Sequence, residues 1–243
     1  MIVDNKRVIV FVGAYGSGKT EIAINYALRR RRLGEKVTLI DLDLVTPYFR
    51  SREARQPLEQ EGVDVVSPEG GLAMADLPVM PPRIAGSLDD RERCVIIDVG
   101  GDPTGARVLG TIRKSLPEGD HDILIVLNAR RPFTRTPDTM LESMGRIEAA
   151  SRVKITGIVN NTHVCGLTTP AEVLDGYEKV AAVGRESGLP VVFSGALKEV
   201  VAQIDADSFP TPLLSISRHM LAPWEQPDEY WKRTTPMRLE EWE

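Results

Sequence analysis

The feature that most constrains this chain is a glycine-rich segment near its start, Gly13-Ala14-Tyr15-Gly16-Ser17-Gly18-Lys19-Thr20. It matches the phosphate-binding loop pattern GxxxxGK[ST] in full. An apolar run precedes the segment and an amphipathic helical pattern follows it. The pattern requires this context, because the loop connects a buried strand to a helix N-terminus, whose N–H groups and dipole favour anions. The segment therefore predicts an α/β fold with a polyphosphate site at the first strand–helix junction.

Seven short apolar runs rich in β-branched residues predict strands that are buried on both faces. They cover residues 8–12, 37–40, 63–66, 94–97, 123–127, 155–159 and 191–193. Helical patterns lie between most of these runs, and the helices expected at 21–33, 52–61 and 170–187 are each followed by a glycine suited to a left-handed helix end. Strands that alternate with helices predict right-handed βαβ units. We therefore expect a three-layer α/β/α fold with a mostly parallel sheet.

The length of 243 residues suits a single domain, which we expect to cover residues 1–221, with a C-terminal tail at 222–243. Two segments fit the alternation poorly. Residues 68–90 suggest a long excursion or lid, and the tail with its three tryptophans looks like an added piece. One helix start is marked by Thr136 before a proline, and another by Thr169 and Glu172, which form a capping-box pattern.

The net charge of −5 argues against a nucleic acid or an anionic membrane as a partner. The N-terminal apolar run is too short for a secretory signal or a membrane span. Cys94 and Cys165 lie far apart, in or beside apolar patterns, which suits small buried residues in a reducing compartment. We therefore expect a cytoplasmic protein with no nucleic acid and no membrane partner.

The glycines of the loop allow backbone N–H groups to turn inward around a polyphosphate. Lys19 is expected to reach the β and γ oxygens as a catalytic cation, and the Thr20 hydroxyl to ligate Mg²⁺. The expected nucleotide contacts in this loop are Gly13, Tyr15, Gly16, Ser17, Gly18, Lys19 and Thr20.

Acidic residues stand at the ends of two further strands. Asp41 and Asp43 lie on one side of the second strand because side chains alternate, and Asp43, nearer the strand's end, is the expected metal ligand or water-positioning carboxylate. Asp98-Val99-Gly100-Gly101 ends the fourth strand in the manner of a Walker B segment. Asp98 is expected to bind Mg²⁺ through water, and an N–H at Gly100 or Gly101 to contact a γ-phosphate. Ligands bind beyond the carboxyl ends of such strands, so these signals predict one site.

The base is expected to lie beyond the sixth strand, which ends in Asn160 and Asn161. A guanine-reading GTPase would carry Asn-Lys-x-Asp here, whereas the Lys and Asp positions are Thr162 and Val164. An asparagine amide offers one donor and one acceptor, which matches the edge of adenine. Asn160 or Asn161 is therefore the candidate for adenine binding, the alternative being that either side chain only caps the strand's exit.

Together these segments resemble the CobQ/CobB/MinD/ParA group of P-loop ATPases, of the SIMIBI class, over roughly residues 6–205. The resemblance implies a mostly parallel sheet of seven or eight strands, ATP with Mg²⁺, and a nucleotide-dependent homodimer. It also implies that Lys19 and Thr20 are the P-loop pair, Asp43 the switch I acid that positions water, and Asp98 the Walker B acid.

The chain departs from this group at Ala14, where members of the deviant Walker type carry a signature lysine. Without this trans-acting cation we expect slow hydrolysis or a replacement cation. The available arginines, in the stretches 46–53 and 128–134, are Arg50, Arg52, Arg130 and Arg131. The histidines His121, His163 and His219 show no metal-ligand spacing and are expected to be structural or solvent-facing.

Three functions are consistent with these residues. The first is a nucleotide-controlled switch or maturation ATPase whose state is read by a protein partner. The second is an ATP-dependent enzyme such as a small-molecule kinase or an amidoligase, whose arginine-rich loops hold an acidic substrate. The third is a nucleotide-binding module without meaningful hydrolysis, because Ala14 replaces the lysine.

Overall fold

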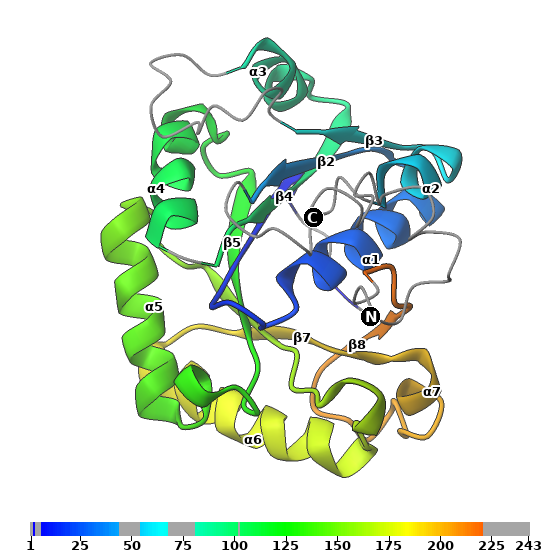
Figure 1. The fold of residues 1–243 in the computed structure, drawn as a ribbon, viewed down its shortest axis with the longest axis vertical. Helices are drawn as coiled ribbons and strands as arrows, with labels where there is room; N and C mark the ends of the chain where they lie inside the picture. The colour runs from blue at the N-terminus through cyan, green and yellow to red at the C-terminus, as the bar shows by residue number, and fades with distance from the viewer. Residues whose placement is uncertain (1, 3–5, 44–53, 68–80, 102, 221–243) are drawn as a thin grey trace, which may run out of the picture.

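Eight parallel strands form one sheet in the order β3-β2-β4-β1-β5-β6-β7-β8 (Figure 1). The computed structural model describes residues 2, 6–43, 54–67, 81–101 and 103–220. The strands are β1 (Val8–Val12), β2 (Lys36–Leu42), β3 (Val63–Val66), β4 (Arg93–Val99), β5 (His121–Leu127), β6 (Gly157–Asn160), β7 (Val191–Leu197) and β8 (Leu213–Ile216). The order changes direction at β1, so the carboxyl end of β1 is the topological switch point, the position where open α/β sheets bind ligands.

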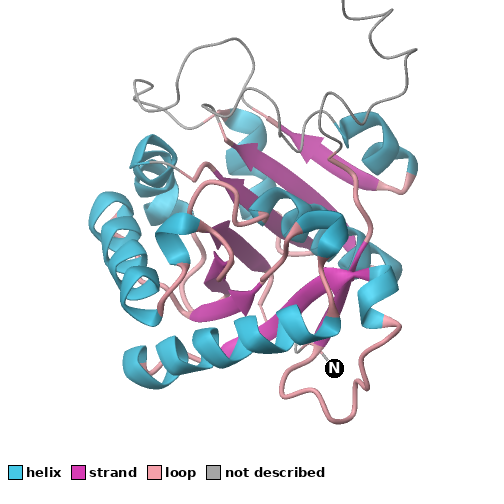
Figure 2. Cartoon of the chain, turned by 60° about the horizontal axis from the view of Figure 1, so that its bottom comes forward, coloured by secondary structure: helices cyan, strands magenta, loops and turns pink. Residues whose placement is uncertain are grey.

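Helices cover both faces of the sheet (Figure 2). They are α1 (Lys19–Arg32), α2 (Arg55–Gln60), α3 (Pro82–Asp89), α4 (Pro103–Ile112), α5 (Pro137–Ser151), α6 (Pro170–Ser187) and α7 (Lys198–Val201), with short 3₁₀ turns η3 (Arg113–Ser115), η4 (Pro132–Thr134) and η5 (Cys165–Leu167). Buried residues of α1 and α2 pack on one face, and those of α3, α4, α5 and α6 on the other. The predicted three-layer α/β/α fold is therefore confirmed.

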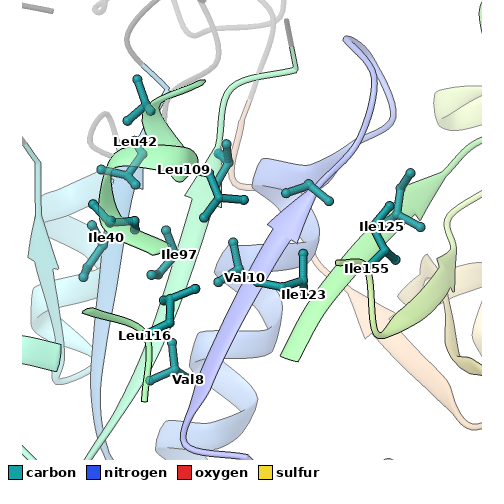
Figure 3. Packing of buried hydrophobic residues seen from close by; sticks show 14 of the residues in the cluster. Val8, Val10, Ile40, Leu42, Ile97, Leu109, Leu116, Ile123, Ile125 and Ile155 are labelled. Carbon is teal, nitrogen blue, oxygen red and sulfur yellow. The ribbon is translucent and has the colours of Figure 1, made fainter. Parts of the chain in front are cut away.

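The two core layers follow from the continuous apolar runs of the strands. On one face Val10, Ile97 and Ile123 extend from three adjacent strands, β1, β4 and β5 (Figure 3). On the other face Phe11 of β1 packs edge-to-face against Tyr26 of α1, with ring centroids 5.5 Å apart. Parallel strands between two helical layers bury both faces, which explains why the strands carry apolar residues at consecutive positions.

Several predicted boundaries shift in the structure. The sixth strand begins at Gly157 instead of residue 155, the seventh continues to Leu197, and β8 was not among the predicted runs because it is short and partly exposed. The predicted excursion at 68–90 contains helix α3 in its described part, where Ile84 and Leu88 pack into the core. Residues 68–80 and the predicted tail at 222–243 lie outside the described residues.

One helix cap differs from its prediction. Helix α6 begins after Thr169, whose hydroxyl accepts a hydrogen bond from the Glu172 N–H at 3.3 Å, as expected. The reciprocal half of the capping box is missing because the Glu172 carboxylate binds the Arg130 guanidinium. The residue that the sequence assigned to a cap therefore anchors an arginine of the loop after β5.

Helix α1 also holds the segment that follows β8. The Glu21 carboxylate accepts hydrogen bonds from the N–H groups of His219, at 2.9 Å, and Met220, at 2.6 Å. The Asn25 side chain donates to the Ser217 carbonyl and accepts from the Ser217 N–H, both at 2.9 Å. Burial raises the pKa of Glu21 to about 7, although these N–H donors act against the shift. The helix that starts at the phosphate loop is thus tied to residues 217–220.

Candidate functional site

The loop between β1 and α1 adopts a conformation that depends on its glycines. Gly16 and Gly18 have φ angles of +75° and +84°, and Gly18 is the N-cap of α1. A Cβ added to Gly13 would lie 2.5 Å from the Val126 carbonyl oxygen of β5, so the loop packs against the neighbouring strand with no space for a side chain. The loop therefore ends at the N-terminus of α1, as a phosphate-binding loop requires.

Asp98 lies at the end of β4, beside this loop. It is 0% exposed, and neither oxygen of its carboxylate has a hydrogen-bond partner among the described residues. The pKa of Asp98 is raised to about 7, first by burial and then by the neighbouring charge of Asp41, while the charge of Lys19 and the nearby Thr20 hydroxyl act against the shift. A buried carboxylate without donors is costly unless a ligand or cation completes the site.

Gly101 and Lys19 lie against each other. A Cβ added to Gly101 would be 2.8 Å from the Lys19 Nζ and 2.7 Å from the Tyr15 backbone nitrogen. Lys19 is buried, and its Nζ donates to the Ala14 carbonyl at 3.4 Å. Tyr15, in contrast, is 66% exposed, so its backbone faces the site and its ring does not. The structure thus brings the P-loop lysine and the Walker B glycine together.

The second strand places both of its acids near the site. Asp41 is the register partner of Asp98 across β2 and β4, and its Oδ1 accepts a hydrogen bond from the Asp43 N–H at 2.9 Å. Both Asp41 and Asp43 are buried. The sequence favours Asp43 as the site acid, but after burial itself the charge of Asp41 raises the pKa of Asp98 most, and Asp43 adds a smaller contribution. The alternation of side chains along the strand was the available signal for Asp41.

The two asparagines after β6 have different surroundings. Asn160 is 0% exposed and donates to the Val173 carbonyl and the Ser194 hydroxyl, while its Oδ1 accepts two hydrogen bonds from Thr162. Its amide is therefore committed to the interior, and Asn160 does not fit the predicted contact with adenine. Asn161 donates to the Ser17 carbonyl of the phosphate loop at 2.8 Å. Asn161 thus contacts the loop.

The loops after β5 and β6 are joined by Asn128. This side chain, 0% exposed, donates to the His163 carbonyl and accepts from the N–H groups of Arg130 and His163. The Arg130 side chain points to α6, where it forms ion pairs with Glu172 and Asp175. Arg130 is therefore not the replacement cation. Sequence reasoning missed Asn128 as an organising residue, since one asparagine after a strand resembles any strand cap.

Arg131 and His163 border the phosphate loop. The Arg131 Nε donates to the Gly16 carbonyl at 2.8 Å, and a Cβ added to Gly18 would lie 3.2 Å from the His163 Nε2. The pKa of His163 is lowered to about 4, mainly by burial and in addition by the positive charges of Arg131 and Arg218. The Cys165 N–H donates to His163 Nδ1, so the neutral ring carries its proton on Nε2. Neither Arg50 nor Arg52 belongs to the described residues.

The donor set beside the loop fits Mg²⁺. A metal bound with a polyphosphate would take the Thr20 hydroxyl as a ligand and Asp98 through water, and would complete the orphaned carboxylate. When bound, Mg²⁺ would neutralise charge that develops on the phosphate oxygens. Lys19 would add a second positive charge, and the N-terminus of α1 its N–H groups.

Comparison with known proteins supports this architecture. The chain is 29% identical over 241 residues to the signal recognition particle 54 kDa protein of Methanopyrus kandleri, an alignment that covers 97% of this chain and 47% of that protein. The chain thus spans about half the length of this relative. No known protein-family profile matches.

Solved structures show the same fold. The cell division protein FtsY of Thermotoga maritima has a TM-score of 0.54 at 22% identity, over 80% of this chain and 65% of that one. The signal recognition particle 54 kDa protein of Aeropyrum pernix, in complex with GDP, has a TM-score of 0.53 at 22% identity, over 78% and 41%. The chain therefore has the three-layer P-loop NTPase fold of the SIMIBI class. The comparisons support this class and not the CobQ/CobB/MinD/ParA group in particular.

Two further findings bear on the sequence predictions. Among the described residues, no helix is long and apolar enough to cross a membrane. Cys94 is buried as expected, whereas Cys165 is exposed because it lies in η5, on the loop after β6.

Proposed function

We propose that this chain is a Mg²⁺-dependent nucleoside-triphosphate-binding protein that hydrolyses its nucleotide slowly and acts as a switch. The observation that carries the proposal is the carboxylate of Asp98, which is fully buried beside Lys19 and the N-terminus of α1 and has no hydrogen-bond partner in the part of the chain that the structure describes. Carboxylate, lysine and helix N-terminus together suit a metal–polyphosphate complex and little else. Slow turnover follows from Ala14, which leaves the loop without the signature lysine.

For the base we propose guanine. A similar structure holds GDP, and the amide of Asn160, on which the argument for adenine partly depended, is committed to internal hydrogen bonds. Because Val164 stands where a guanine-binding carboxylate is expected, guanine must be read by other groups. Every binding assay should therefore compare GTP with ATP.

As a switch, the protein would pass its nucleotide state to a protein partner in the cytoplasm, and a second copy of the chain is the first candidate for that partner. The alternative function, a kinase or amidoligase with an acidic substrate, depended on free arginines in the loops. Among the described arginines, Arg130 is paired with Glu172 and Asp175 and Arg131 contacts the phosphate loop, so neither favours a separate site for an acidic substrate.

The test is thermal unfolding with GTP, GDP, ATP or ADP, each with and without Mg²⁺. A ligand at a hundred times its dissociation constant stabilises the fold by about 2.7 kcal/mol, or roughly 5–11 °C for a chain of this size. We expect the largest shift with GTP and Mg²⁺, and its loss in Lys19→Ala. The control is Lys114→Ala, at an exposed lysine of η3. A Lys19→Ala protein that binds triphosphates like the wild type would refute the site, and equal shifts with GTP and ATP would refute guanine selectivity.

A further inference from the structure

Two adjacent arginines of the loop after β5 have opposite surroundings. Arg130 faces α6 and is neutralised by Glu172 and Asp175. Arg131 lies across the phosphate loop, where its Nε donates to the Gly16 carbonyl at 2.8 Å. Its guanidinium packs on the Gly16 Cα, because a Cβ added there would lie 3.1 Å from Nε and 3.3 Å from Cζ. One arginine of the pair therefore belongs to the scaffold and the other to the loop.

Arg131 contacts a carbonyl of the phosphate loop, whereas an anion would be bound by the N–H groups of that loop. In a phosphate-binding loop the N–H groups turn inward to the anion, so carbonyl oxygens on the outer side need other partners. Arg131 binds the Gly16 carbonyl, and Asn161 binds the next carbonyl, that of Ser17, at 2.8 Å. Side chains from the loops after β5 and β6 thus hold two successive peptide units in position.

Arg131 also brings a charge that no acid of the described residues neutralises. Its two Nη groups make no hydrogen bond or ion pair within the described part of the chain. The charge acts on its surroundings, since it lowers the pKa of His163, whose Nε2 faces Gly18. A half-buried guanidinium with free donors next to a phosphate loop is well suited to an anionic ligand.

We propose that Arg131 is a positioning residue that braces the phosphate loop through Gly16 and supplies, from the same chain, positive charge that Ala14 does not provide. This inference rests on the proposed function. Because Arg131 acts through the loop, its effect falls on the phosphate part of the ligand, whatever the base. The ligand class at issue is an inorganic or nucleoside triphosphate with Mg²⁺.

The test compares Arg131→Ala with Arg130→Ala by titration calorimetry, using GTP, ATP and inorganic tripolyphosphate, each with Mg²⁺. Loss of a charged hydrogen bond predicts that Arg131→Ala weakens the binding of every ligand by a similar factor, about 10- to 100-fold. Arg130→Ala should bind all of them like the wild type. Arg131→Lys, which keeps the charge on a single donor nitrogen but loses the planar guanidinium, should lie between the wild type and Arg131→Ala.

A loss with GTP or ATP but none with tripolyphosphate would overturn the proposal, because Arg131 would then contact the nucleoside. An unchanged affinity in Arg131→Ala would overturn it as well. Hydrogen exchange of residues 13–20 without ligand measures the brace directly, and faster exchange in Arg131→Ala than in Arg130→Ala is expected. A wild-type protein that binds no triphosphate would instead refute the proposed function, and the exchange rates would then decide whether Arg131 holds the loop.

Discussion

Replacement of Asn128 by alanine would remove the connection between the loops after β5 and β6. The side chain makes three hydrogen bonds, to the N–H of Arg130 at 2.9 Å and to the N–H and carbonyl of His163 at 3.3 Å each. Since Asn128 is fully buried, each lost bond costs about 1 kcal/mol, and we expect Asn128→Ala to lower the free energy of unfolding by about 3 kcal/mol. For a chain of this size that is a fall of roughly 6–12 °C in melting temperature.

Chemical denaturation followed by fluorescence would measure the loss. The matched control is Asn161→Ala, another buried asparagine, which loses one side-chain hydrogen bond, to Ser17, and should cost about 1 kcal/mol. Triphosphate affinity of Asn128→Ala should fall as well, since Arg131 and His163 depend on the two loops. The reasoning is wrong if Asn128→Ala is no less stable than Asn161→Ala, or if it binds triphosphate like the wild type.

Two further predictions concern ionisable groups. Asp43→Ala should retain nucleotide but lose hydrolysis, whereas Asp98→Ala should also weaken Mg²⁺-dependent binding; matching kinetics and affinities for the two variants would mean that their roles are misassigned. The lowered pKa of His163 means that the folded protein favours the neutral ring. This contribution to the free energy of unfolding is fully present above 6.5, the pKa of the unfolded chain, and is lost as pH falls from 6.5 toward about 4. At pH 5 the loss is about 2 kcal/mol. It should be measured as the difference between wild type and His163→Gln, because Asp98 and Glu21, with raised pKa values, act in the opposite direction; equal pH profiles of the two proteins would contradict it.

The elements that sequence reasoning placed well are those set by local patterns. Continuous apolar runs revealed most of the strands, and the loop motif predicted the junction of β1 and α1, because both depend on neighbouring residues only. Strand β8 was not predicted, because its four residues, one of them with an exposed side chain, form too short a pattern to recognise. Helix α3 was not predicted because Pro81, Pro82 and Gly86 are typical of a loop, although the apolar residues Ile84 and Leu88, one turn apart, bury one face of the helix.

The orientation of side chains in the site could not be read from spacing. Arg130 and Arg131 are adjacent and chemically identical, yet one pairs with α6 and the other with the phosphate loop. Asn160 and Asn161 differ in the same way. In both pairs the partner lies on an element distant in sequence, so only the packing of α6 and the phosphate loop against the strand ends decides which residue faces the ligand.

The hydrogen bonds between helix α1 and residues 217–220 limit how far this protein can be truncated at its C-terminal side. Glu21 and Asn25 satisfy the backbone after β8, and that backbone in turn satisfies a carboxylate with a pKa raised to about 7. A chain cut at residue 216 would leave Glu21 without its N–H donors, one residue from the Thr20 hydroxyl of the phosphate loop. Shortened versions used for binding assays should therefore end beyond Met220, or a trimming effect will be mistaken for a nucleotide effect.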